Sequence, residues 1–177
     1  MRSLYEVSGQ ELRWEKPKWL KRRYELRAGE EVVATLVRSG GSKAIGEWSG
    51  GRYCFSQKGW FNLRILVGDD AITDANAPLA TFTRRGGVLT LADGRRLLWV
   101  KLGFWKSKRV WSDGAAALVE FDAASGYASP QVTITDEGAR LTELPLLLLL
   151  GEYLIVRARE ETDAASAATT AAIIASA

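Results

Sequence analysis

The feature that most constrains this chain is a segment near the C-terminus, residues 144–156, in which almost every residue is apolar. Pro145 suits the first turn of a helix, and the leucines that follow it favour helix over strand. Residues 146–150 point in every direction around such a helix, so no polar stripe remains to face water until Glu152. A helix of this kind must be enclosed.

Either a bilayer or a protein core could enclose it. A helix that crosses hydrocarbon needs ~20 consecutive apolar residues. The apolar run here is shorter and contains Gly151 and Glu152. The sequence therefore predicts no transmembrane segment and a helix surrounded by the rest of the protein.

The rest of the chain is divided by turn signals, among them Gly40-Gly41, Gly86-Gly87 and Asp93-Gly94. Spacings of ~8–12 residues between such signals are typical of an all-β sandwich or barrel. Residues 61–67 alternate most clearly, with apolar and polar side chains on opposite faces. With one or two strands near the N-terminus, the candidate strands are 20–27, 31–38, 43–49, 52–57, 61–67, 79–84, 88–92, 95–102, 109–112, 115–122 and 131–135.

Strands and helix together predict a mainly β fold, a closed antiparallel barrel of about twelve strands around one central hydrophobic C-terminal helix. About eight strands already fill their interior with side chains, whereas about a dozen leave room for a plug. We expect one barrel domain at 1–159, with its helix at about 142–157, and an Ala-rich tail at 160–177. Because the helix would fill the lumen, sites are expected on the outer surface or the rims.

The residue inventory argues against an enzyme. The chain has no histidine and one cysteine, Cys54, so histidine-based catalysis, an internal disulfide and the usual zinc sites are excluded. The paired carboxylates Asp69-Asp70 are interpreted as turn residues, and Glu120 with Asp122 as the outward face of a strand. No phosphate-binding loop is present. We predict a non-enzymatic protein with no cofactor and no metal.

Two segments that mix basic and aromatic residues, 14–23 and 101–111, are the strongest functional lead, since a net charge of +3 is too small to indicate nucleic acid by itself. Basic residues near tryptophan suit an anionic membrane surface, where each contributes about 1 kcal/mol. An alternative is that the aromatics are core residues and the basic residues a solvated face. The candidate residues for lipid-headgroup binding are Lys101, Lys106, Lys108, Arg109, Lys18, Lys21 and Arg23.

The order of elements resembles that of the superfamily comprising the tubby C-terminal domain, the LURP-one-related proteins and the phospholipid scramblases, in particular the small bacterial LURP-one-like proteins. The resemblance covers residues 20–156 and rests on GWFNLRILVGD, VLTLADGRRLLWVK, SDGAAALVEFD and LPLLLLLGEYLIV. It implies a twelve-stranded barrel around a hydrophobic helix. A single cysteine and scattered acidic residues do not match the palmitoylation and calcium-binding segments of the scramblases. No family site is transferred to this chain.

The expected function is that of a tubby-like barrel module that binds anionic phospholipid headgroups peripherally. The alternative is a protein-interaction or regulatory barrel with no lipid role, whose partner the sequence does not identify. Nucleic-acid binding ranks third, because strand-borne basic and aromatic residues can stack bases. Since the N-terminus has no signal-peptide pattern, we expect the cytoplasm, with attachment to the membrane surface if lipid is bound.

Overall fold

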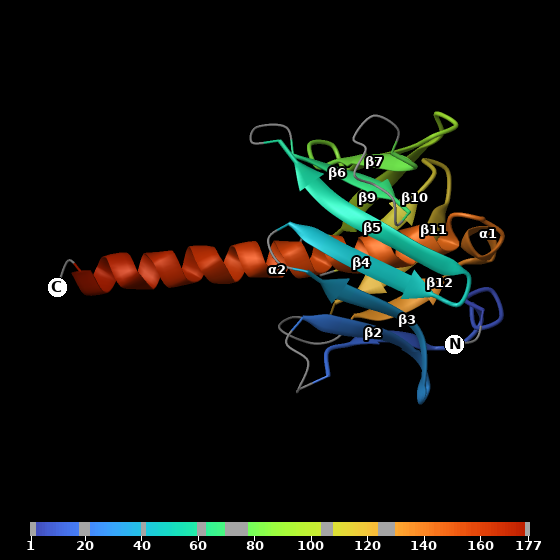
Figure 1. Ribbon diagram of the computed structural model, residues 1–177, viewed down its shortest axis with the longest axis horizontal. Coiled ribbons are helices and arrows are strands. Elements are labelled where there is room, and N and C mark those ends of the chain that lie inside the picture. Colours follow the sequence, from blue (N-terminus) through green and yellow to red (C-terminus); the bar gives the residue numbers. More distant parts are fainter. Residues whose placement is uncertain are drawn as a thin grey trace.

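The computed structural model describes residues 3–17, 22–39, 42–59, 63–69, 78–103, 108–123 and 130–175, with side chains up to residue 168. Strands make up most of this chain, and two helices follow them near the C-terminus (Figure 1). The elements are β1 (Leu12–Glu15), β2 (Arg23–Ala28), β3 (Glu31–Arg38), β4 (Lys43–Trp48), β5 (Gly51–Lys58), β6 (Arg64–Gly68), β7 (Ala80–Thr83), β8 (Val88–Leu91), β9 (Arg96–Leu102), β10 (Lys108–Ser112), β11 (Ala117–Asp122), β12 (Gln131–Ile134), α1 (Asp136–Ala139) and α2 (Leu144–Ala175).

The strands form one closed antiparallel barrel in which each strand pairs with its neighbours in sequence. The pairing of β1 with β12, through Leu12 opposite Val132, closes the sheet. Closure leaves neither of these terminal strands with an unpaired edge. The predicted fold class, a closed barrel of about twelve strands with one hydrophobic helix near the C-terminus, is confirmed.

Alternation along the strands determines which side chains enter the lumen. On β6, Ile65 and Val67 are buried, whereas Arg64, on the opposite face of the strand, is exposed. On β7, Ala80 and Phe82 are buried in the same way. Because side chains of a strand point alternately to its two faces, these strands supply apolar inner rows to the lumen.

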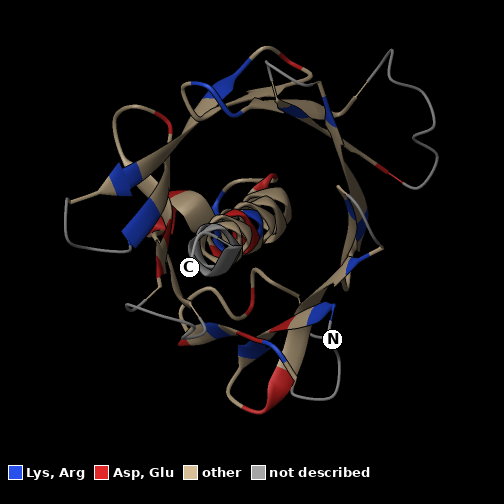
Figure 2. Ribbon diagram, turned by 90° about the vertical axis from the view of Figure 1, so that its left-hand side faces the viewer, with Lys and Arg blue, Asp and Glu red and all other residues tan. Residues whose placement is uncertain are grey.

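The first half of α2 occupies the lumen, as Figure 2 shows in a view along the barrel. Residues 146–150 are at most 3% exposed, and each enclosed leucine contributes about 2 kcal/mol relative to an exposed one. Trp111 on β10 donates a hydrogen bond from Nε1 to the carbonyl oxygen of Leu147, at 2.9 Å. Gly151 has no side chain because the ring of Phe121 occupies the space that a Cβ would need.

One end of the barrel, where α2 begins, is closed by chain from both termini. Leu4 and Val7 are buried there within the N-terminal turns. Tyr5 donates a hydrogen bond from its hydroxyl to the carbonyl oxygen of Thr142, at 3.1 Å. The short helix α1 lies beside β11, with Thr135 as its N-cap. We call this end the closed end.

At the opposite end, α2 leaves the barrel and runs on to Ala175, well past the predicted helix end at about 157 (Figure 1). The Ala-rich segment 160–177 is expected as a tail beyond the barrel domain, and its described part continues the helix. The physical reason is that alanine and glutamate extend an existing helix at little cost. Thr162 and Ser166 also direct their hydroxyls back to carbonyl oxygens four residues earlier. No helix among the described residues has a stretch apolar and long enough to span a bilayer.

Candidate functional site

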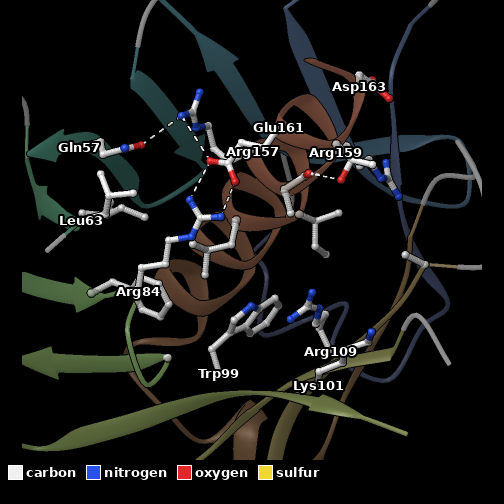
Figure 3. Close-up of a pocket in the computed structure, with 18 residues that line it drawn as sticks. Gln57, Leu63, Arg84, Trp99, Lys101, Arg109, Arg157, Arg159, Glu161 and Asp163 are labelled. Atoms are coloured by element: carbon white, nitrogen blue, oxygen red, sulfur yellow. Dashed lines mark hydrogen bonds and ion pairs between the residues drawn. The ribbon is translucent and has the colours of Figure 1, made fainter. Parts of the chain in front are cut away.

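A cavity of about 660 Å³ opens where α2 leaves the barrel, between the helix and the wall formed by β5 to β11 (Figure 3). We call it the exit cavity. Its residues come from strand ends that meet at this rim and from two turns of the helix. They are Gln57, Leu63, Ile65, Phe82, Arg84, Gly87, Trp99, Lys101, Arg109, Ala123, Leu154, Ile155, Arg157, Ala158, Arg159, Glu161, Thr162 and Asp163.

The cavity exists because α2 is attached to the opposite side of the lumen. Tyr153 donates a hydrogen bond from its hydroxyl to the carbonyl oxygen of Ser42, at 2.7 Å. Arg38 on β3 forms an ion pair with Glu160 on the helix. Both contacts draw the helix towards β3 and β4. The expectation that the helix fills the lumen is therefore wrong at this end, where space remains inside the barrel.

The inner part of the cavity is apolar. Leu63, Ile65 and Phe82 come from the barrel wall, and Leu154 and Ile155 face them from α2. Trp99 completes this floor and belongs to an aromatic cluster, with its ring 4.8 Å from that of Trp111 and 5.4 Å from that of Phe121. Such mutual packing fixes the shape of the floor.

The mouth of the cavity is charged, with five basic residues against two acidic ones in the lining. Arg84 neutralises Glu161 through a two-pronged ion pair, in which Nη1 and Oε1 are 2.7 Å apart. This contact lowers the pKa of Glu161 and keeps it ionised. Arg157 donates to Gln57 at 3.3 Å and lies 3.5 Å from Glu160. These contacts attach the helix to the rim and leave an excess of positive charge.

Lys101 and Arg109 supply the part of that charge that has no counter-ion among the described residues. They lie directly opposite each other on β9 and β10, on the inner face that Trp99 and Trp111 occupy deeper in the barrel. Neither side chain has a hydrogen bond or an ion pair with a described residue. Partial burial lowers the pKa of Arg109, although arginine remains protonated at neutral pH. An anion entering the mouth would meet both cations (Figure 3).

The structure separates the candidate residues that the sequence grouped together. Lys101 and Arg109 meet in the exit cavity. Lys108 forms an ion pair with Glu120 across β10 and β11, and Arg23 forms one with Glu25 at 3.0 Å, on the outside of the barrel. The remaining candidates, Lys18, Lys21 and Lys106, lie outside the described residues.

The cysteine and carboxylates considered for catalysis lie apart from one another in the structure. Cys54 is half-buried on β5, and Glu120 is occupied by its ion pair with Lys108. Asp69 is exposed just after β6, and Asp70 lies outside the described residues. Within the described part of the chain, no three residues of the types His, Cys, Asp and Glu are grouped so that they could hold a metal ion.

Sequence reasoning missed Arg84, Arg157 and Arg159 as cavity residues. A signal for Arg84 was present, because it follows Phe82 by two residues and so belongs to the same face of its strand. For Arg157 and Arg159 the signal was their position directly after the apolar run. What the sequence lacked was any indication that these three positions meet.

Unlike its apolar neighbours, Glu152 is an acidic residue within the buried half of α2. The sequence suggested that it faces water, but it is 1% exposed, and its Oε2 has no hydrogen-bond partner among the described residues. Burial raises the pKa of its carboxyl to about 8, against the opposing effect of Arg159. Glu152 is buried because it lies one helical turn after Leu148, on the same face of α2. The group is therefore protonated at neutral pH.

Comparisons of the chain with protein-family models, with curated proteins and with solved structures found no match. The exit cavity therefore has to be interpreted from its own geometry and charge.

Proposed function

We propose that this protein is a non-enzymatic barrel module that binds anionic phospholipid headgroups at a membrane surface through the mouth of the exit cavity. The observation that carries the proposal is the pair of Lys101 and Arg109, which face each other at the rim without an acidic partner among the described residues. Guanidinium and ammonium groups are the side chains best suited to phosphate and carboxylate oxygens.

The surroundings of the pair favour a membrane over a soluble partner. Val100 and Leu102, the sequence neighbours of Lys101 on β9, point to the outer face of the barrel beside the rim and are 38% and 42% exposed. Exposed apolar side chains beside cations can enter the interface while the cations contact headgroups. The tubby-like resemblance points in the same direction, since tubby proteins bind phosphoinositides. The role of a protein-interaction barrel has no comparable feature among the described residues.

Vesicle co-sedimentation tests the proposal, with vesicles of phosphatidylcholine alone or mixed with phosphatidylserine. We expect binding only to the mixed vesicles. Lys101→Gln and Arg109→Gln should each weaken it about fivefold, which corresponds to about 1 kcal/mol per basic residue.

Arg96→Gln is the matched control, because Arg96 is an exposed residue at the other end of β9 and its replacement removes the same charge. The control should bind like the wild type. The proposal is contradicted if the protein binds equally to vesicles with and without phosphatidylserine. It is also contradicted if the double replacement of Lys101 and Arg109 leaves vesicle binding unchanged.

A further inference from the structure

We propose that the exit cavity is a site for one acyl chain, so that the ligand is a monoacyl anionic lipid of the fatty-acid or lysophospholipid class. This inference rests on the proposed function and specifies it. The head would lie on Lys101 and Arg109, and the chain would lie on the apolar floor between α2 and the barrel wall.

The first argument is the match between the two parts of the cavity and an amphiphile. Polar lining is concentrated at the mouth, whereas the floor is formed by aliphatic and aromatic side chains such as Ile65, Phe82 and Leu154. A nucleotide or sugar phosphate would leave its polar ring atoms without partners against this floor, which costs free energy. A chain of methylene groups instead removes apolar surface from water.

The second argument is size. Cavities of ~300–1,000 Å³ hold small-molecule ligands, and the exit cavity has about 660 Å³. At roughly 30 Å³ per non-hydrogen atom, the share of a water molecule in the liquid, this volume takes ~20 such atoms. One chain of about 16 carbons with a small head is within that number.

The third argument is that the space is built into the fold. Ala158 and Ala123 are small residues that leave the width of the cavity open. At Gly87, φ is +62° and a Cβ would lie 2.6 Å from the carbonyl oxygen of Trp99, so a larger residue would distort the wall there. The contacts of Tyr153 with Ser42 and of Arg38 with Glu160 hold the helix against β3 and β4, and the ion pair of Arg84 with Glu161 joins it to this wall at the mouth.

The fourth argument is charge. An uncharged head would leave the half-buried guanidinium of Arg109 without a counter-charge among the described residues, whereas a carboxylate or phosphate would neutralise it. Because Glu161 is already held by Arg84, it does not compete for that position. The ligand should therefore carry its negative charge at one end of the chain.

Fluorescence quenching tests the inference, with a fatty acid brominated in mid-chain as the probe, below its micelle concentration. Bromine quenches tryptophan only at contact, and Trp99 lies in the floor. We expect saturable quenching in the unmodified protein. Trp99→Phe should remove most of it, which assigns the signal among the seven tryptophans. The corresponding brominated fatty alcohol should bind at least tenfold more weakly, because charged hydrogen bonds are lost.

Ala158→Trp fills the cavity without a change of charge and should weaken fatty-acid binding at least tenfold. Ala164→Trp places the same side chain on the exposed part of α2, outside the cavity, and should leave both fatty-acid binding and vesicle binding unchanged. Circular dichroism checks that both variants are folded.

The outcomes separate this inference from the proposed function. If the vesicles bind but the brominated acid does not quench the unmodified protein, the acyl site is overturned and headgroup binding stands. If the brominated acid quenches tryptophan but the protein does not bind vesicles, the cavity binds soluble fatty acid and the proposed membrane binding is overturned. Equal binding of the acid and the alcohol overturns the requirement for an anion.

Discussion

The two ends of the barrel treat the same helix in opposite ways. At the closed end, α2 is surrounded on all sides, and Leu4, Val7 and α1 cover the opening. At the exit end, the helix is attached to β3 and β4, and the exit cavity lies on the other side of the helix. The difference shows that the helix stabilises the barrel with its first half and shapes a site with the turns that follow.

A charge placed in the enclosed half of α2 tests this difference most strongly. Leu148→Asp should abolish the folded state, because an unpaired carboxylate in the lumen costs more than about 4 kcal/mol. Leu148 is 0% exposed, whereas Leu102 is 42% exposed on the outside. Leu102→Asp is therefore the control and should fold normally. The measurement is the cooperative thermal transition by circular dichroism, and a folded Leu148→Asp protein would contradict the enclosed helix.

Glu152, in the buried half of α2, tests the enclosed part of the helix through its titration. Its folded pKa of about 8 lies above the ordinary value of 4.5, so unfolding releases a proton between these values. The free energy of unfolding should then fall as pH rises from about 5 to 8, by as much as about 5 kcal/mol. Below the ordinary value, both states are protonated and the effect is absent.

Glu152→Gln should remove this pH dependence and leave the variant more stable than the wild type at pH 8. Urea unfolding at several pH values measures it. Glu137→Gln on α1 is the control, since Glu137 is exposed and its replacement should preserve the wild-type slope. A wild-type protein whose stability does not decline between pH 5 and 8 would show that the Glu152 carboxyl is ionised in the lumen.

The smallest effect concerns the charge at the exit end. Glu161→Gln releases Arg84 from its ion pair and adds one positive charge to the mouth. We expect phosphatidylserine vesicles to bind about fivefold more tightly, and stability to fall by less than about 1 kcal/mol. Glu137→Gln changes the charge equally at the closed end and should not alter binding. Unchanged or weaker binding in Glu161→Gln would argue against the mouth as the anion site.

How far the site could be predicted depends on the kind of information each residue carries. Lys101 and Arg109 were identified because they lie beside aromatic residues, although the sequence grouped them equally with Lys108 and Arg23. Alternation distinguishes these pairs, since Lys101 and Arg109 continue the inner face while Lys108 lies on the outer face of the same strand. Applying the strand period to the charged residues, and not only to the apolar ones, would have separated them.

The architecture of this protein follows from local patterns in its amino-acid sequence. Period-two strands between regular turns, together with one helix apolar on every side, leave a closed barrel around that helix as the simplest arrangement, and these patterns depend only on neighbouring residues. Tertiary structure alone decided the position of α2 across the lumen, the burial of Glu152 and the meeting of Arg84 with Glu161. Each of these depends on contacts between residues distant in sequence, such as Tyr153 with Ser42, and no local period encodes them.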